Sequence, residues 1–179
     1  MKKFIKKFNS GFSIVESMVA IAVVTLAITS ATSVVQNSFK SVQITRARIQ
    51  AMYLASEAIE FGRNLRDSAI VSGSTGNNFS GSVNSFANEC KNDGCFVDVL
   101  SNINKYGKCN NDSCGDIYLT NTKYTSDNSE GNKKTVFNRR VYTELSGDGQ
   151  ELKVNVTVSY TVRGFSEEIV LDSYLMNHE

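Results

Sequence analysis

Apolar residues are concentrated in one block near the start of this 179-residue chain. Residues 12–35 read FSIVESMVAIAVVTLAITSATSVV and contain one charged residue, Glu16. At 1.5 Å per residue, a helix of these 24 residues is about 36 Å long, which is enough to cross a hydrocarbon core of about 30 Å. The pattern therefore predicts a helix that is apolar on all sides and long enough to span a membrane.

The helical pattern continues past the apolar block and becomes amphipathic. Small and apolar residues recur at three- and four-residue steps, at Ala47, Ala51, Leu54, Ala55, Ala58, Gly62 and Leu65. The chain contains no proline, so a single helix from about residue 12 to about residue 67 is permitted. We expect the stripe in residues 36–67 to pack against a sheet.

The rest of the chain divides into a polar region and a strand region. Residues 68–134 are predicted to be a loop region that contains the cysteines. Its first part, 68–88, is rich in Ser, Gly and Asn, and Phe79 and Phe86 are expected to anchor it. Residues 135–179 contain three strand patterns joined by turns: 135–145, 151–162 and 167–176. The predicted fold class is α+β, a long N-terminal helix packed on a C-terminal antiparallel sheet of three strands, or four if Ile117–Thr120 adds an edge strand.

Charge is distributed as unevenly as hydrophobicity. The 19 basic and 18 acidic residues give a net charge of +1, which offers no indication of nucleic-acid binding. Residues 1–11 contain four lysines and no acid, so a basic flank precedes the apolar block and predicts a cytoplasmic N-terminus. A cleaved secretory signal is disfavoured, because the apolar run exceeds the usual length and no convincing cleavage site follows it. A plain anchor does not account for Glu16, which costs about 2.5–3.5 kcal/mol in lipid.

The sequence Gly11-Phe12-Ser13-Ile14-Val15-Glu16, behind a Lys-rich leader and ahead of an apolar helix, resembles the class III signal of type IV prepilins and pseudopilins. The resemblance implies that a prepilin peptidase cleaves between Gly11 and Phe12 and methylates the new N-terminal Phe12. Removing 11 of 179 residues would leave a mature chain of 168, with Glu16 as its fifth residue. In this family, the acid is thought to attract the N-terminus of a neighbouring subunit.

The same resemblance implies a function. The chain would enter the cytoplasmic (inner) membrane as a single-pass precursor and be polymerised by the pilus assembly machinery into an extracellular helical filament of identical subunits. One alternative is a minor pilin or pseudopilin of a type II secretion or DNA-uptake system. Another, from a different class, is a monomeric membrane-anchored surface adhesin.

Four cysteines form two units of the same spacing, CKNDGC and CNNDSC, at Cys90, Cys95, Cys109 and Cys114. Outside the membrane such cysteines favour disulfides, and zinc is less favoured because no His is nearby and neither arm has a two-residue spacing. The Asn-Asp turn within each unit favours local pairing, 90–95 and 109–114. The nested pairing, 90–114 and 95–109, stays open.

Other candidate chemistry is sparse. The lone His178 excludes most His-dependent catalysis, no nucleophile–base pair or phosphate loop is evident, and we expect neither an enzyme nor a cofactor. Residues 127–132, DNSEGN, are oxygen-rich, but two lysines follow and the spacing does not match an EF-hand; we interpret them as a solvated loop, with calcium as the alternative. Two basic pairs, Arg46/Arg48 and Arg139/Arg140, are interpreted as a charged solvated face, with subunit contacts as the alternative.

Overall fold

The computed structural model describes residues 13–72, 79, 81–101, 105–111, 113–129 and 131–177. The chain divides into two compact units, Met1–Val42 and Gln43–Glu179, each of which is considered by itself. The fold class is α+β, as predicted: a long N-terminal helix, α1 (Ile14–Val71), and an antiparallel sheet on which it packs. A short second helix, α2 (Gly81–Glu89), follows.

The sheet has seven strands among the described residues, rather than the three or four predicted. Three are long and consecutive, namely β5 (Lys133–Leu145), β6 (Glu151–Val162) and β7 (Phe165–Met176). Four are short, namely β1 (Cys95–Val97), β2 (Tyr106–Lys108), β3 (Asp116–Thr120) and β4 (Lys123–Thr125). All the pairings between them are antiparallel.

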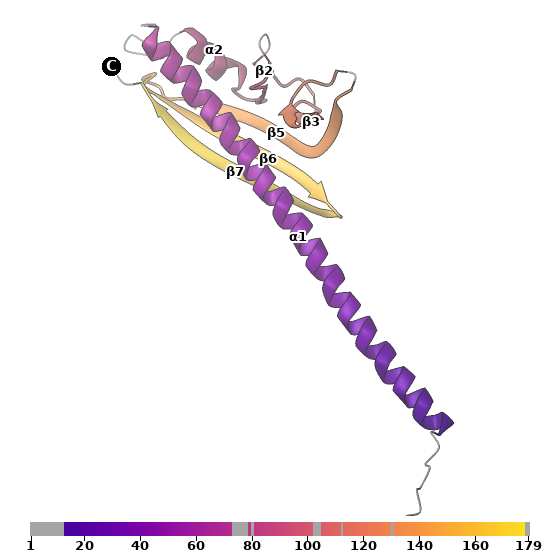
Figure 1. The fold of residues 1–179 in the computed structure, drawn as a ribbon. Coiled ribbons are helices and arrows are strands. Elements are labelled where there is room, and N and C mark those ends of the chain that lie inside the picture. Colours follow the sequence, from indigo (N-terminus) through magenta and orange to yellow (C-terminus); the bar gives the residue numbers. More distant parts are fainter. Residues whose placement is uncertain are drawn as a thin grey trace, which may run out of the picture. The chain divides into compact units, whose positions relative to one another are not determined.

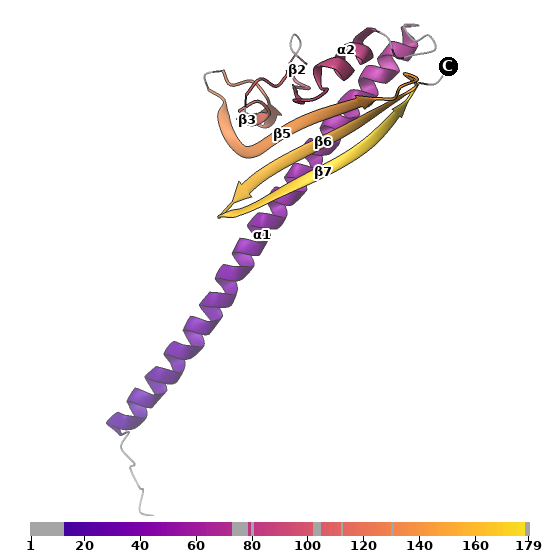
Figure 2. The same ribbon diagram turned by 180° about the vertical axis from the view of Figure 1, so that it is seen from behind.

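Strand β5 is the centre of the sheet. Along one edge it pairs with β6 through nine residues, from Phe137 opposite Tyr160 to Leu145 opposite Leu152. Its other edge pairs with β3 near Lys133–Asn138 and with β1 at Val141. The long strands lie side by side in Figures 1 and 2, with the second half of α1 across one face. The predicted turn between β5 and β6 is present and contains Asp148 and Gly149, the latter at φ 71°.

The core lies between the α1 stripe and the inward face of β6. Alternate residues of β6 are buried, at Leu152, Val154, Val156, Val158 and Tyr160. The helix contributes mostly small side chains, because Ala51, Ala55 and Ala58 have no measurable exposure. These helix residues and the inward residues of β6 belong to one buried core, so the prediction that this stripe covers a sheet is confirmed.

Where they are described, residues 68–134 contain more regular structure than the loops predicted, and the possible strand at Ile117–Thr120 is present as part of β3. Helix α1 continues to Val71, and α2 and four short strands follow. The nine residues of α2 are fewer than a helical periodicity needs to be recognised, and its stability comes from tertiary contacts: Phe86 is fully buried, with its ring edge-to-face against Phe61 and Tyr106. Phe79 is 4% exposed, so the predicted anchoring by Phe79 and Phe86 is confirmed.

Arg139 is a buried cation, and its interpretation as part of a solvated face is wrong. It occupies an inward position of β5, between Phe137 and Val141, and is 3% exposed. Its Nη1 donates to the Leu54 carbonyl at 2.8 Å and to Glu57 Oε2 at 2.7 Å, and its Nη2 donates to the Val97 carbonyl at 2.6 Å. One guanidinium thereby joins α1, β5 and β1.

The β6–β7 hairpin is tied to the helix at its turn. Arg163 and Gly164 adopt positive φ angles of 51° and 77°, the conformation of a two-residue hairpin turn. Arg163 Nε donates to the Gln43 side chain, and Arg48 Nε lies 3.5 Å from Glu167 Oε1. Burial and the hydrogen bond from its phenol to Glu167 together raise the pKa of Tyr160 to about 12.

We predict that Glu57→Gln destabilises the Gln43–Glu179 unit by about 2 kcal/mol, because Arg139 would keep its burial and lose its counter-ion. Urea unfolding of the detergent-solubilised chain, followed by the circular dichroism of the sheet, measures this. The matched control is Glu60→Gln, which breaks the exposed Glu60–Arg63 pair and should cost less than about 0.5 kcal/mol. Equal losses in the two variants would contradict the assigned role of Arg139.

A second prediction concerns alkaline pH. A tyrosine whose folded-state pKa is raised stabilises the fold below its ordinary pKa of 10.0, and this contribution is lost as the pH rises toward about 12. Between these limits the free energy of unfolding of Tyr160→Phe should therefore fall less steeply than that of the unsubstituted chain. Tyr53→Phe, at a side chain that is 73% exposed, should leave the slope unchanged. Identical slopes for all three chains would refute the assignment to Tyr160.

Candidate functional site

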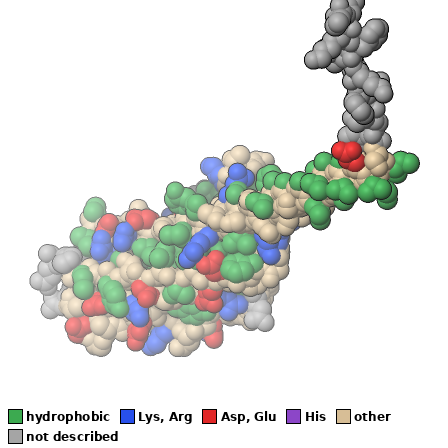
Figure 3. Space-filling view, turned by 90° about the horizontal axis from the view of Figure 1, so that it is seen from below, with side chains coloured by type: hydrophobic (Ala, Val, Ile, Leu, Met, Phe, Trp, Pro, Cys, Tyr) green, Lys and Arg blue, Asp and Glu red, His purple; other side chains and the backbone are tan. Residues whose placement is uncertain are grey.

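The first candidate site is the apolar helical segment of the Met1–Val42 unit. Its large side chains are exposed around the helix; Ile14, Met18, Leu26, Val34 and Phe39 range from 65% to 80% exposed. Figure 3 shows these apolar side chains gathered along the segment. Within the described residues, α1 is the one helix long and apolar enough to cross a membrane, which is consistent with a single-pass membrane protein.

Most of the hydroxyl side chains in this segment are satisfied by their own helix. Thr25, Thr29, Ser30 and Thr32 each donate to a backbone carbonyl three or four residues earlier, at 2.8–3.0 Å. This internal bonding removes the cost of placing a hydroxyl in an apolar medium. These four hydroxyl groups therefore need no external partner.

Glu16 differs from these hydroxyls. It lies in the first turn of α1, where the helix dipole favours a negative charge, and its side chain is exposed. No described residue forms an ion pair or hydrogen bond with its carboxylate. Gly11 and Phe12, the predicted cleavage and methylation residues, lie outside the described residues. Glu16 is thus a carboxylate in an apolar stretch with which no described residue pairs.

The second candidate region contains the cysteines, which pair locally as Cys90–Cys95 and Cys109–Cys114. The first bridge closes the turn between α2 and β1, and the second closes the turn between β2 and β3. The favoured local pairing is the one observed, and the nested pairing and the zinc site are wrong. No cysteine is free.

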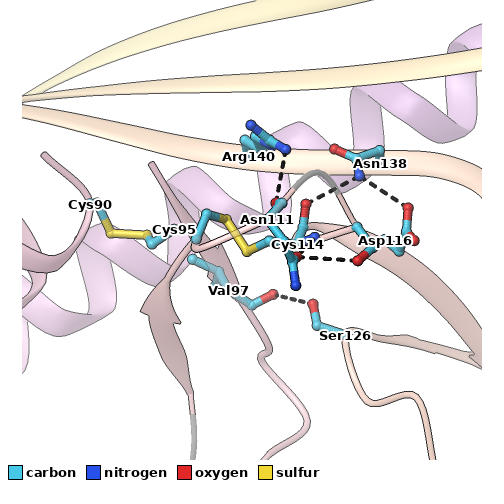
Figure 4. The surroundings of a disulfide bond; sticks show 11 residues. Cys90, Cys95, Val97, Asn111, Cys114, Asp116, Ser126, Asn138 and Arg140 are labelled. Atoms are coloured by element: carbon cyan, nitrogen blue, oxygen red, sulfur yellow. Dashed lines mark hydrogen bonds between the residues drawn. A yellow bond between two sulfur atoms is a disulfide. The ribbon is translucent and has the colours of Figure 1, made fainter. Parts of the chain in front are cut away.

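The two bridged turns are attached to each other and to β5 (Figure 4). Cys109 N donates to the Gly94 carbonyl at 3.0 Å, and the Asn138 side chain donates to the Cys114 carbonyl at 3.2 Å. Gly115, at φ 90°, passes so close to β5 that an added Cβ would lie 2.3 Å from the Arg139 carbonyl. The bridges therefore fix short irregular segments against a strand that is already well paired.

Two further candidates from the sequence, the loop at 127–132 and the arginine pairs, offer weaker support for a functional site. In the loop at 127–132, Asp127 Oδ1 accepts the Ser129 amide and Asn132 donates to the Asp127 carbonyl, so these oxygens serve the loop itself. The described residues contain no group of three or more His, Cys, Asp or Glu arranged to hold a metal, and Glu130 lies outside them. Arg48 is exposed beside Glu167, and Arg140 donates to the Asn111 carbonyl.

No protein-family model, curated protein or solved structure matches this chain. Assignment of a function therefore depends on the pattern of residues 1–35 and on the geometry described here. One further feature is the buried carboxylate of Asp98, one residue beyond the end of β1. Its sequence setting, Phe-Val-Asp-Val-Leu, is that of an ordinary strand end, and nothing in it indicates burial.

The observed bridges lead to a prediction for the redox state of the chain. Non-reducing peptide mapping should recover Cys90 linked to Cys95 and Cys109 linked to Cys114, with no alkylatable thiol. Replacing both Cys109 and Cys114 with serine should cost about 2 kcal/mol, the chain-entropy value for so short a loop, and leave the first bridge intact. Recovery of a peptide joining Cys90 to Cys114 would overturn this arrangement.

Proposed function

We propose that this chain is the structural subunit of an extracellular type IV pilus-like filament. It would be inserted in the cytoplasmic membrane as a precursor, cleaved after Gly11, methylated at Phe12 and polymerised through its apolar helix. The observation that carries the proposal is the exposure of apolar side chains all around the first part of α1, interrupted by a single acid.

The physical requirement is that this apolar surface be covered wherever the protein resides. Before assembly, lipid covers it at little cost to the backbone, because the amides beyond the first turn are bonded within the helix. In a filament, the same side chains of neighbouring subunits would replace the lipid, so the free energy of burial is retained outside the membrane. A helix that is apolar on all sides suits both surroundings.

Glu16 favours assembly over a lone anchor. In lipid an unpaired carboxylate is costly, whereas a second charge of opposite sign recovers much of that cost. Cleavage would create such a charge, the α-amino group of Phe12. In the proposed filament, this group of an incoming subunit would pair with Glu16 of its neighbour and bring the two helices into register.

Two other functions remain as candidates. A pseudopilin or minor pilin of a type II secretion or DNA-uptake system would use the same cleavage and the same helix contact. It would differ from the proposed pilus subunit in the extent of polymerisation. A monomeric anchored adhesin would have no prepilin peptidase or assembly machinery among its partners, and Glu16 would then have no counter-charge to meet.

The proposal is tested by Glu16→Val in the native host. The substitution makes the span more apolar, so membrane insertion and cleavage should persist while the number of surface filaments falls sharply, by at least about tenfold for the loss of a buried charge pair. Thr25→Val is the matched control: it also replaces a polar residue of the helix with valine, but the lost hydroxyl is bonded to its own backbone. Filaments are counted by negative-stain microscopy, and the processed subunit is quantified in the same cells.

A third strain, Gly11→Val, separates the candidate functions. A branched side chain at the cleavage position should leave the leader attached, giving an inserted precursor that is eleven residues longer and forms no filament. An unsubstituted protein that retains Met1 at its N-terminus would establish the monomeric anchor instead. Abundant filaments from the Glu16→Val strain would show that the carboxylate is not required for assembly.

A further inference from the structure

Asp98 is a buried carboxylate that no basic side chain of the described residues neutralises. It is 4% exposed, one residue beyond the end of β1. Its Oδ1 accepts the Leu100 amide at 3.0 Å, and its Oδ2 accepts the Thr125 hydroxyl at 2.6 Å and the Ser126 amide at 3.1 Å. Three donors to one buried charge make a strong anchor, and it joins the segment after β1 to the segment after β4.

The segment after β4 is irregular, yet its own hydrogen bonds fix its shape. The Asp127 amide donates to the Thr125 hydroxyl at 3.1 Å, so the chain of bonds continues directly from Asp98. Farther along, the Asn132 side chain donates to the Asp127 carbonyl and accepts from the Thr120 hydroxyl. The Ser126 hydroxyl bonds back to the Val97 carbonyl at 3.1 Å (Figure 4). These bonds make a polar wall that is formed before any ligand arrives.

Between these two segments lies a hollow, here called the Asp98 pocket, with a volume of about 740 Å³. This is within the range of about 300–1,000 Å³ that is usual for small-molecule sites. Two apolar side chains, Phe96 and Leu100, border it together with hydroxyl and amide groups. The Asn128 side chain is exposed there and bonds to no described group, which leaves its donors and its acceptor available.

Phe96 provides a fixed aromatic surface at the edge of the pocket. Its neighbours in β1, Cys95 and Val97, point into the core, so the strand alternation turns Phe96 outward. Gly107 is its cross-strand partner, and a Cβ added there would lie 2.8 Å from the Phe96 ring. The ring thus packs directly on the glycine backbone, and it also borders a second hollow of about 300 Å³.

The charges around the pocket favour an uncharged ligand. Among the described residues that line the pocket, Lys123 and Asp127 contribute one charge of each sign, and the charge of Asp98 is already used by three donors. The other polar groups are neutral hydroxyls and amides, which donate and accept equally well. A cation would find few free oxygens, because both oxygens of Asp98 and one of Asp127 accept hydrogen bonds from the protein.

A ligand that meets this surface needs several hydroxyl groups and an apolar face for the aromatic ring. We propose that the Asp98 pocket binds a neutral sugar residue, with Asn128 bonding its hydroxyls and Phe96 packing against its C–H face. This site does not depend on polymerisation, so the binding proposal applies equally to a filament subunit and to a monomeric anchored protein. It adds a binding activity to the proposed structural role.

The test uses the full chain in a detergent without a sugar headgroup. Saturation-transfer NMR is recorded with the methyl glycosides of glucose, galactose, mannose and N-acetylglucosamine as neutral probes, and with N-acetylneuraminic acid as the anionic probe. At least one neutral glycoside should bind. Asn128→Ala should weaken that binding about fivefold, the value for one hydrogen bond, while Asn64→Ala, at an exposed asparagine of α1, should leave it unchanged.

A second pair of variants tests the aromatic surface. Phe96→Leu should weaken binding about tenfold while keeping an apolar residue in β1, and Gly107→Ala should weaken it by moving the ring without removing it. Non-reducing peptide mapping checks that each variant retains both bridges. Three results would overturn the proposal: no neutral glycoside binds, Asn128→Ala binds as well as the unsubstituted chain, or only N-acetylneuraminic acid or added Ca²⁺ perturbs the pocket.

Discussion

The contact between the small-residue stripe of α1 and the alternating apolar face of β6 is the constraint on which the Gln43–Glu179 unit depends. The alanines Ala51, Ala55 and Ala58 of the helix and the valines of β6 (154, 156 and 158) are all buried in one core. Because both surfaces are fully buried, a one-residue shift of β6 would turn its valines to solvent. The register of β5 and β7 follows from that of β6 through continuous pairing.

Two buried charges then organise the parts of the chain that have no strong pattern of their own. Arg139 binds the Leu54 and Val97 carbonyls and Glu57, which places β1 against the helix as well as against β5. Asp98 lies one residue beyond Val97 and fixes the segments after β1 and β4. The disulfides close the adjoining turns. Short strands that would be unstable alone are thus stabilised by the bonds of the buried charges, by the disulfides and by the hydrogen bonds of strand pairing.

In the Met1–Val42 unit, the helix bonds most of its own hydroxyl groups and leaves its apolar surface exposed. Most of the hydroxyls bond to backbone carbonyls, whereas the carboxylate of Glu16 bonds to no described group. That difference is the reason we favour assembly over a permanent anchor: a single uncompensated charge is costly in lipid and becomes useful when a neighbour supplies an amine. Sugar binding at the Asp98 pocket would be an independent property of the other unit.

The sequence by itself determined the elements whose periodicity is long and regular: α1, the three long strands with their turns, and the α+β class. It also favoured the local cysteine pairing, because each Asn-Asp turn can close its own bridge. Tertiary structure alone decided α2, β1, β2 and β4, which are too short for periodicity to be recognised, and the burial of Arg139 and Asp98. From sequence alone, a charged residue is predicted to be exposed. Its burial depends on partners that folding brings from distant elements, because only these offset the cost of desolvating the charge.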